Sequence, residues 1–179
     1  MADYVITTDS NSDVLPEFIK ENDLTIIPQY YSFGDTVYGD ELNMPPHEFY
    51  ETMRKGELPK SQANNPAVIR DKFEKILKEG KNILHIAFSS ALSGSCNNVV
   101  MTANELLEDY PDRKIMVFDS LNASLGEGVS VYRAVELWKE GKSMEEVYDI
   151  LMEERDHVNV SFTVNDLYHL QRGGRVSDV

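Results

Sequence analysis

Short apolar runs alternate with serine-rich polar segments along the chain. The runs at residues 4–8, 83–88 and 114–118 are apolar or nearly so over their whole length, as is typical of strands covered on both faces of a parallel sheet. Each run is followed by a serine-rich turn and then by a segment with helical periodicity. This repeated pattern predicts an α/β fold, with a mostly parallel sheet and helices on both of its faces.

The region between the first two of these runs predicts one more strand and two helices. The strand is expected in "LTIIPQYYSF", and the helices in "PPHEFYETMRKG" and "NPAVIRDKFEKILKEG". The second helix begins with Asn65 as its cap and Pro66 at its first position, and it ends at Gly80. Its apolar face is formed by Ile69, Phe73, Ile76 and Leu77.

The last part of the chain predicts a surface helix and then a different kind of strand. Ser143 and Glu146 have the spacing of a capping box at the start of "SMEEVYDILMEERDHV". "HVNVSFTVNDL" then alternates apolar and polar residues, which predicts a half-buried strand in a new sheet. We therefore expect an N-terminal α/β domain over residues 1–157 and the beginning of a second α/β domain over residues 158–179, incomplete because little chain follows Val176.

Composition and charge exclude several classes of function. The apolar runs fall far short of the roughly 20 residues needed to span a bilayer, and the first residues carry no basic segment, so we expect a cytoplasmic protein without an integral membrane segment. The net charge of −14 argues against binding nucleic acid or an anionic membrane. A single cysteine, Cys96, and four scattered histidines predict no metal site.

The serine-rich turns are the candidate site. In a parallel sheet the turns at residues 8–13, 89–95 and 119–124 should lie along one edge, beyond the carboxyl ends of the strands, where ligands bind. Serine, asparagine and aspartate also cap helices everywhere, and this alternative explains any one turn by itself. Three such turns together, with glycines at positions 94, 126 and 128, favour a binding site.

Sequence motifs restrict the chemistry of this site without settling it. Neither nucleotide-binding glycine motif is present, and "SSALSGSCNN" has no lysine or arginine to balance a polyphosphate. The nucleophile pattern GxSxG is missing, and His85 and Cys96 are interpreted as core residues. A neutral clamp for a singly charged anion is therefore the favoured interpretation. A hydrolase of esters or phosphate esters with Ser93 as nucleophile, and a regulatory domain that binds a polar small molecule, remain as alternatives.

Six motifs follow one another along the chain: "TTDSNSD", "IIPQYYSFGDTVYGD", "ELPKSQANNPAVI", "IAFSSALSGS", "VFDSLNASLGEG" and "VNDLYHLQRGGRVS". In this order they resemble the DegV family of bacterial fatty-acid-binding proteins over essentially the whole chain. This resemblance implies two α/β domains with a fatty acid buried between them and its carboxylate held by hydroxyls. It also implies a partner, an ATP-dependent fatty acid kinase, to which such proteins present the acid without being the catalyst or holding a cofactor.

The resemblance also nominates individual residues. The family's SSxLSGT loop corresponds to "SSALSGS", which makes Ser93, with Gly94 and Ser95 beside it, the carboxylate ligands. A second hydroxyl falls on Ser61 when "LPKSQANNP" is aligned without a gap. The "RGGR" segment places Arg172 near the carboxylate or the kinase, and Arg175 at the kinase.

Overall fold

The computed structural model describes residues 3–164 and 167–177, which belong to two compact units. The first unit combines residues Met1–Gln29 with Ala63–Val158, and the second combines Tyr30–Gln62 with Asn159–Val179. The units are thus interleaved along the chain. The division into domains 1–157 and 158–179 that the sequence suggests stays a prediction.

The first unit is built on a four-stranded parallel sheet with the strand order β2-β1-β6-β7. The three apolar runs form β1, β6 and β7, each within one residue of its expected bounds, so the predicted fold class is confirmed. The strands are β1 (Tyr4–Asp9), β2 (Thr25–Ile27), β6 (Asn82–Ala87) and β7 (Ile115–Asp119).

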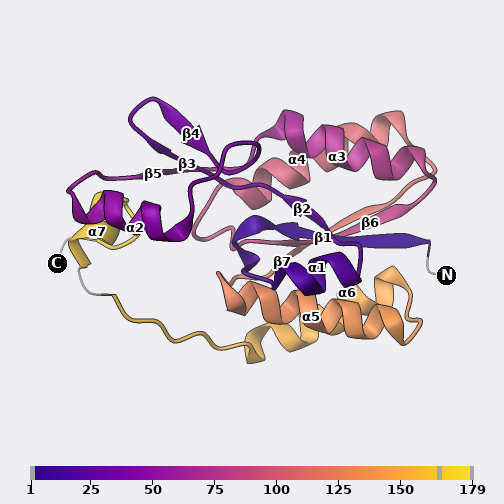
Figure 1. The fold of residues 1–179 in the computed structure, drawn as a ribbon. Coiled ribbons are helices and arrows are strands. Elements are labelled where there is room, and N and C mark those ends of the chain that lie inside the picture. Colours follow the sequence, from indigo (N-terminus) through magenta and orange to yellow (C-terminus); the bar gives the residue numbers. More distant parts are fainter. Residues whose placement is uncertain (1–2, 165–166, 178–179) are drawn as a thin grey trace. The chain divides into compact units, whose positions relative to one another are not determined.

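Helices cover both faces of this sheet, as Figure 1 shows. One face is covered by α3 (Pro66–Lys78) and α4 (Ser95–Asp109). The other face is covered by α1 (Pro16–Glu21), α5 (Leu125–Lys139) and α6 (Met144–Glu154). Two short 3₁₀ turns, η1 (Ser10–Ser12) and η2 (Arg155–His157), complete the unit.

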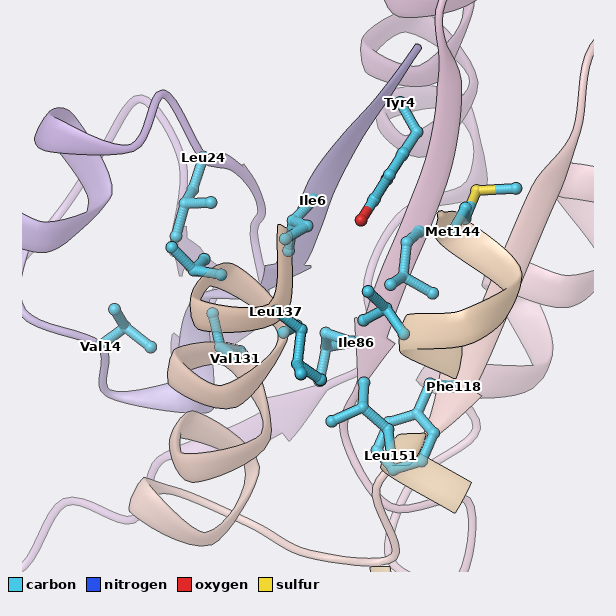
Figure 2. Packing of buried hydrophobic residues seen from close by; sticks show 14 residues of the cluster. Tyr4, Ile6, Val14, Leu24, Ile86, Phe118, Val131, Leu137, Met144 and Leu151 are labelled. Carbon is cyan, nitrogen blue, oxygen red and sulfur yellow. The ribbon is translucent and has the colours of Figure 1, made fainter. Parts of the chain in front are cut away.

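Alternate residues of the strands fill two separate cores. Ile6, Ile86 and Phe118 point to one face, where they pack with Val131, Leu137 and Leu151 of α5 and α6 (Figure 2). Ile83 and Val117 point to the other face, where they pack with α3 and α4. Because side chains alternate along a strand, a continuously apolar run buries both of its faces, which explains why these strands lack alternation in the sequence.

The predicted helix caps are present. The Asn65 side chain accepts the N–H of Ala67 at 2.9 Å, with Pro66 at the first helical position. Ser143 Oγ accepts the N–H of Glu146 at 3.2 Å, and the Glu146 carboxylate accepts the N–H of Ser143 at 2.8 Å. These bonds satisfy N–H groups that have no partner inside the helix.

The second unit contains a small antiparallel sheet with the strand order β4-β3-β5. Its rings pack on one another, with Tyr31 stacked on Tyr38 at 5.2 Å and edge-on to Phe49 at 5.0 Å between centroids. The elements are β3 (Tyr30–Phe33), β4 (Thr36–Tyr38), α2 (Pro46–Arg54), β5 (Lys60–Gln62) and α7 (Leu167–Arg172).

Two expectations from the sequence are wrong. "LTIIPQYYSF" forms two strands in two different sheets, β2 and β3, because Pro28 lies between them and has no N–H to continue a ladder. Residues 158–164 form no strand, and Phe162 is 79% exposed. No strand among the described residues pairs with this segment, so its backbone has no ladder to join. Asn165 and Asp166 of the same motif lie outside the described residues.

Gly128, in the first turn of α5, lies close against the turn after β1. A Cβ added there would lie 2.6 Å from the carbonyl oxygen of Ser12. We expect Gly128→Ala to lower the free energy of unfolding by about 1–3 kcal/mol, because backbone must move to make room. Urea denaturation measures this. Gly94→Ala is the matched control because a Cβ at position 94 meets nothing within 4 Å; equal effects of both substitutions would contradict the prediction.

Candidate functional site

The turns that follow β1, β6 and β7 meet at the carboxyl edge of the parallel sheet, as predicted. The N–H of Ser90, after β6, donates to Oδ1 of Asp119, at the end of β7, at 3.1 Å. Ser124, in the turn after β7, donates its hydroxyl to Oδ2 of Asp13, after β1, at 2.6 Å. The turn after β7 is therefore hydrogen-bonded both to the turn after β6 and to the turn after β1.

Backbone strain is concentrated at the same edge. Asp13, Leu121 and Ser124 have φ values of 54°, 52° and 53°, in the region that favours glycine. Residues in such conformations persist only where the surrounding structure holds them, and they gather at functional sites. Asp13 and Ser124 are cap residues of η1 and α5, so the strain at Leu121 is the part that helix capping does not explain.

A buried carboxylate, Asp9, supports the serine loop from below. Its Oδ2 accepts the N–H of Phe88, the first residue after β6, at 2.8 Å. Its Oδ1 accepts a hydrogen bond from Nδ2 of Asn64 at 3.5 Å, and Nε2 of His85 lies 3.7 Å from Oδ2. Asp9, Asn64 and His85 are all almost completely buried, so the hydrogen bonds of this carboxylate offset the cost of removing it from water.

The four serines of "SSALSGS" have different roles. Ser89 is buried, and its hydroxyl accepts the N–H of Ala91 at 3.2 Å, which shapes the turn. Ser90 is exposed. Ser95, the first residue of α4, is fully buried, whereas Ser93 is half-buried and precedes the exposed cap residue Gly94. Of the two hydroxyls nominated in this loop, that of Ser93 is the one that reaches the surface.

Ser93 is held in place by Ser95. The two Oγ atoms lie 2.9 Å apart, and the N–H of Ser95 donates to Ser93 Oγ at 3.2 Å. Ser95 is in turn held by its neighbours, because its Oγ accepts the N–H of Asn64 at 3.3 Å and donates to Oε1 of Gln29 at 2.8 Å. The first N–H groups of α4 have no partner within the helix, so Ser93 stands where an anion is favoured.

Neither His85 nor Cys96 provides an activated group for hydrolysis. His85 is fully buried in β6, and its Nδ1 lies 2.9 Å from the hydroxyl of Thr7. Burial, together with the carboxylates of Asp119 and Asp9, raises the pKa of the Cys96 thiol to about 11, so the thiol stays protonated at neutral pH. The interpretation of both as core residues is confirmed. Among the described residues, the hydroxyl of Ser93 bonds only with Ser95.

Glu127, in the "GEG" segment at the start of α5, is a buried acid in its neutral form. Burial first, and then the nearby carboxylate of Asp9, raise its pKa to about 9. The Thr8 hydroxyl donates to its Oε1 at 3.0 Å, whereas Oε2 has no partner among the described residues. The "GEG" segment therefore packs against the end of β1.

The other nominated residues belong to the second unit. Ser61 lies in β5, opposite Tyr31 of β3, and its Oγ accepts a hydrogen bond from Nη2 of Arg175 at 3.4 Å. Ser61, Arg172 and Arg175 line one hollow of about 520 Å³. Ser61 also borders a second, mostly aromatic hollow of about 440 Å³, lined further by Tyr31, Met44, Pro46, Phe49, Tyr50 and Pro59. Because the two units are described separately, the roles of Ser61 and Ser93 in a common site stay a prediction.

Gln29 and Asn64, whose side chains hold Ser95, are not among the residues that the sequence nominates. Both lie inside quoted motifs, "IIPQYYSF" and "QANNP", as polar residues next to apolar or proline-rich stretches. Their partner is far away in the sequence, so only the fold brings them to it. One signal in the sequence could have pointed to Gln29: it is a polar residue directly after Pro28, where a buried strand ends.

Two further observations concern metal binding and membrane crossing. Over residues 3–164 and 167–177, no cluster of three or more histidine, cysteine, aspartate or glutamate side chains is suited to hold a metal ion. In the same part of the chain, no helix combines the length and the apolar character needed to cross a bilayer.

Comparisons with known proteins agree on one family. The profile described as "Uncharacterised protein, DegV family" matches residues 3–179. A DegV domain-containing protein of Clostridium perfringens is 38% identical over 99% of this chain and 62% of its own length, and one of Lactococcus lactis is 32% identical over 97% and 61%. The chain thus spans about 60% of the length of these relatives.

Solved structures give the same result. A stearic acid-binding protein of Eubacterium ventriosum has a TM-score of 0.86 and 29% identity, and the match covers 97% of this chain and 60% of that one. A DegV family protein of Thermus thermophilus, described by its fatty acid binding, has a TM-score of 0.84 and 30% identity, with the same coverage.

The buried acid Glu127 predicts how stability depends on pH. Its pKa is about 9 in the folded chain, against an ordinary value of 4.5, so the unfolded chain releases a proton between these values that the folded chain keeps. Stability is therefore lost as the pH rises through this window. Glu127→Gln removes this titration, and between pH 5 and pH 7.5 its stability should rise relative to the original chain by at most roughly 3 kcal/mol.

Urea midpoints of both chains, measured at several pH values, test this prediction. Glu108→Gln is the control because Glu108 is exposed on α4. A difference between Glu127→Gln and the original chain that does not change with pH would show that Glu127 is ionised in the folded protein.

Proposed function

The chain belongs to the DegV family, and we propose that it binds a long-chain fatty acid, whose carboxylate is held by Ser93 at the start of α4. The observation that carries this proposal is the half-buried Ser93 hydroxyl, fixed by Ser95 at a helix N-terminus in a loop without cations. Such a clamp suits a single negative charge. The fatty acids bound by similar proteins of solved structure support the same ligand class.

The energetics explain why the clamp is needed. Burying an acyl chain of about 14 methylenes contributes roughly 11 kcal/mol before the costs of association. A buried carboxylate without partners would cancel several kcal/mol of this gain, and each charge-assisted hydrogen bond returns about 1.5–3 kcal/mol. In a chain with a net charge of −14, these donors must be local. The Ser93 hydroxyl and the N–H groups that begin α4 are donors of this kind.

The second unit contributes the remaining nominated groups to the proposal. Ser61 is the second proposed hydroxyl for the carboxylate, and the aromatic hollow beside it is suited to apolar chain atoms. Arg172 and Arg175, which line the neighbouring hollow, are proposed to contact the ligand head group or the partner. Arginine is well suited to both because its planar cation binds carboxylates and phosphates with two parallel hydrogen bonds.

The proposed partner is a cytoplasmic, ATP-dependent fatty acid kinase, which phosphorylates the carboxylate to an acyl phosphate. In this arrangement the chain is the binding subunit and not the catalyst. Two observations support a non-catalytic role: the Cys96 thiol is protonated at neutral pH, and the His85 ring is buried beneath the loop. Turnover of an ester or phosphomonoester that depends on Ser93 would contradict it.

Octanoate titration of the ¹⁵N-labelled chain tests the clamp directly. We expect amide shifts at residues 93–97, and Ser93→Ala should weaken octanoate binding about tenfold or more, since it removes a charge-assisted hydrogen bond. Ser90→Ala is the matched control because this exposed serine lies in the same loop. Octanol, which has no charge, should leave the loop amides unshifted. Equal shifts with octanol, or equal affinities of both serine variants, would contradict the proposal.

A further inference from the structure

Gln29 stands directly behind the Ser93–Ser95 pair. Its backbone N–H donates to Ser10 Oγ at 2.9 Å, which fixes the residue between β2 and β3. Its side-chain Oε1 accepts the hydroxyl of Ser95 at 2.8 Å. The other end of the same amide, Nε2, is buried and has no hydrogen-bond partner among the described residues. A buried donor without a partner is costly, so this amide calls for an explanation.

The orientation of the Gln29 amide decides whether the Ser93 hydroxyl can donate its hydrogen to a ligand. A serine hydroxyl has one hydrogen and accepts up to two hydrogen bonds. When Ser95 gives its hydrogen to Gln29, the 2.9 Å contact between the serines must use the hydrogen of Ser93. Ser93 Oγ then only accepts on its other side, from the N–H of Ser95. In this arrangement the outer hydroxyl has no hydrogen left for a carboxylate.

A half-turn of the Gln29 amide reverses the chain of hydrogen bonds. The oxygen and nitrogen of an amide have nearly the same size, so the turn places Nε2 at the 2.8 Å position next to Ser95 Oγ. Ser95 Oγ then accepts from Gln29 and from the N–H of Asn64, and donates to Ser93. Ser93 accepts from the N–H and the hydroxyl of Ser95, and its own hydrogen points to the ligand. The buried Nε2 now has an acceptor, and Oε1 takes the position without a partner, which is less uncommon for a carbonyl oxygen than for an N–H donor.

We propose that Gln29 is a positioning residue for ligand recognition, which donates Nε2–H to Ser95 and thereby directs the Ser93 hydroxyl hydrogen outward, toward a carboxylate. The inference rests on the proposed function for the identity of the ligand, but the orientation of the amide is a property of the chain without ligand. This chain of hydrogen bonds from Gln29 through Ser95 to Ser93, here called the relay, selects head groups that accept hydrogen bonds, such as an ionised carboxylate. It runs through a side chain that does not itself contact the ligand.

The orientation is measured by NMR in the ligand-free chain, without any substitution. Nuclear Overhauser effects from the Gln29 side-chain amide protons to the Ser95 β-protons are expected, because the turned amide places its NH₂ group beside Ser95. In Ser95→Ala, these amide protons should move upfield and exchange faster. Gln62, whose Nε2 donates to Ser32 Oγ at 3.3 Å, is the internal control. Absence of the Overhauser effects, with a shift of only the Gln29 amide carbonyl carbon in Ser95→Ala, would overturn the inference.

A double-mutant cycle then tests the consequence for binding. A carboxylate at position 29 can only accept, so Gln29→Glu should draw the hydrogens of Ser95 and Ser93 inward and weaken octanoate binding about tenfold or more. In the Ser95→Ala background the relay is already broken, and the same substitution should cost about threefold or less. Equal losses in both backgrounds would mean simple charge repulsion, and would overturn the relay.

The two measurements separate the inference from the proposed function. If octanoate does not shift the loop amides of the original chain, the proposed ligand is wrong, and the Overhauser effects still decide the orientation of Gln29. If octanoate binds and the cycle shows no coupling between positions 29 and 95, the ligand is correct and the relay is wrong.

Discussion

The buried carboxylate of Asp9 is the interaction on which the site depends. It stands at the end of β1 and accepts the first N–H after β6, so it fixes where the serine loop leaves the sheet. Through Asn64 it is also connected to Ser95, the residue that begins α4. A carboxylate buried without partners would be unstable, so the loop and Asn64 stabilise Asp9 while Asp9 positions them. At the same edge, burial raises the pKa of Glu127 to about 9, so this acid is neutral at neutral pH.

The proposed recognition of an anion by so acidic a chain depends on this arrangement. A net charge of −14 works against a general positive field around the protein. The loop itself contains no lysine or arginine. The donors of the proposed clamp are dipoles that keep their direction because they are hydrogen-bonded from behind: Ser95 behind Ser93, and Gln29 and Asn64 behind Ser95. Fixed dipoles need no reorganisation when the ligand arrives. The buried layer behind the loop is therefore as much a part of the site as the exposed hydroxyl.

Much of the fold was predictable because the relevant signals are local. Buried parallel strands read as continuous apolar runs, and the capping box of Ser143 and Glu146 is visible within four letters of sequence. The strand expected after Val158 was wrong because alternation indicates only the capacity to pair, and no strand among the described residues pairs with it. Within the candidate site, Ser93 was nominated from its loop motif, and its role stays a prediction. Gln29 and Asn64 were not, because their role arises from contacts with a residue far away in the sequence.

The central claim is that an ionised carboxylate is held at the start of α4, and the pKa of the bound acid tests it most directly. Octanoate labelled with ¹³C at its carboxyl carbon reports this pKa through its chemical shift in a pH titration of the complex. Hydrogen bonds to the charged form should hold the pKa of the bound acid below that of free octanoic acid, and Ser93→Ala should bring it closer to the free value. A bound acid with a raised pKa, or one insensitive to Ser93→Ala, would contradict the account.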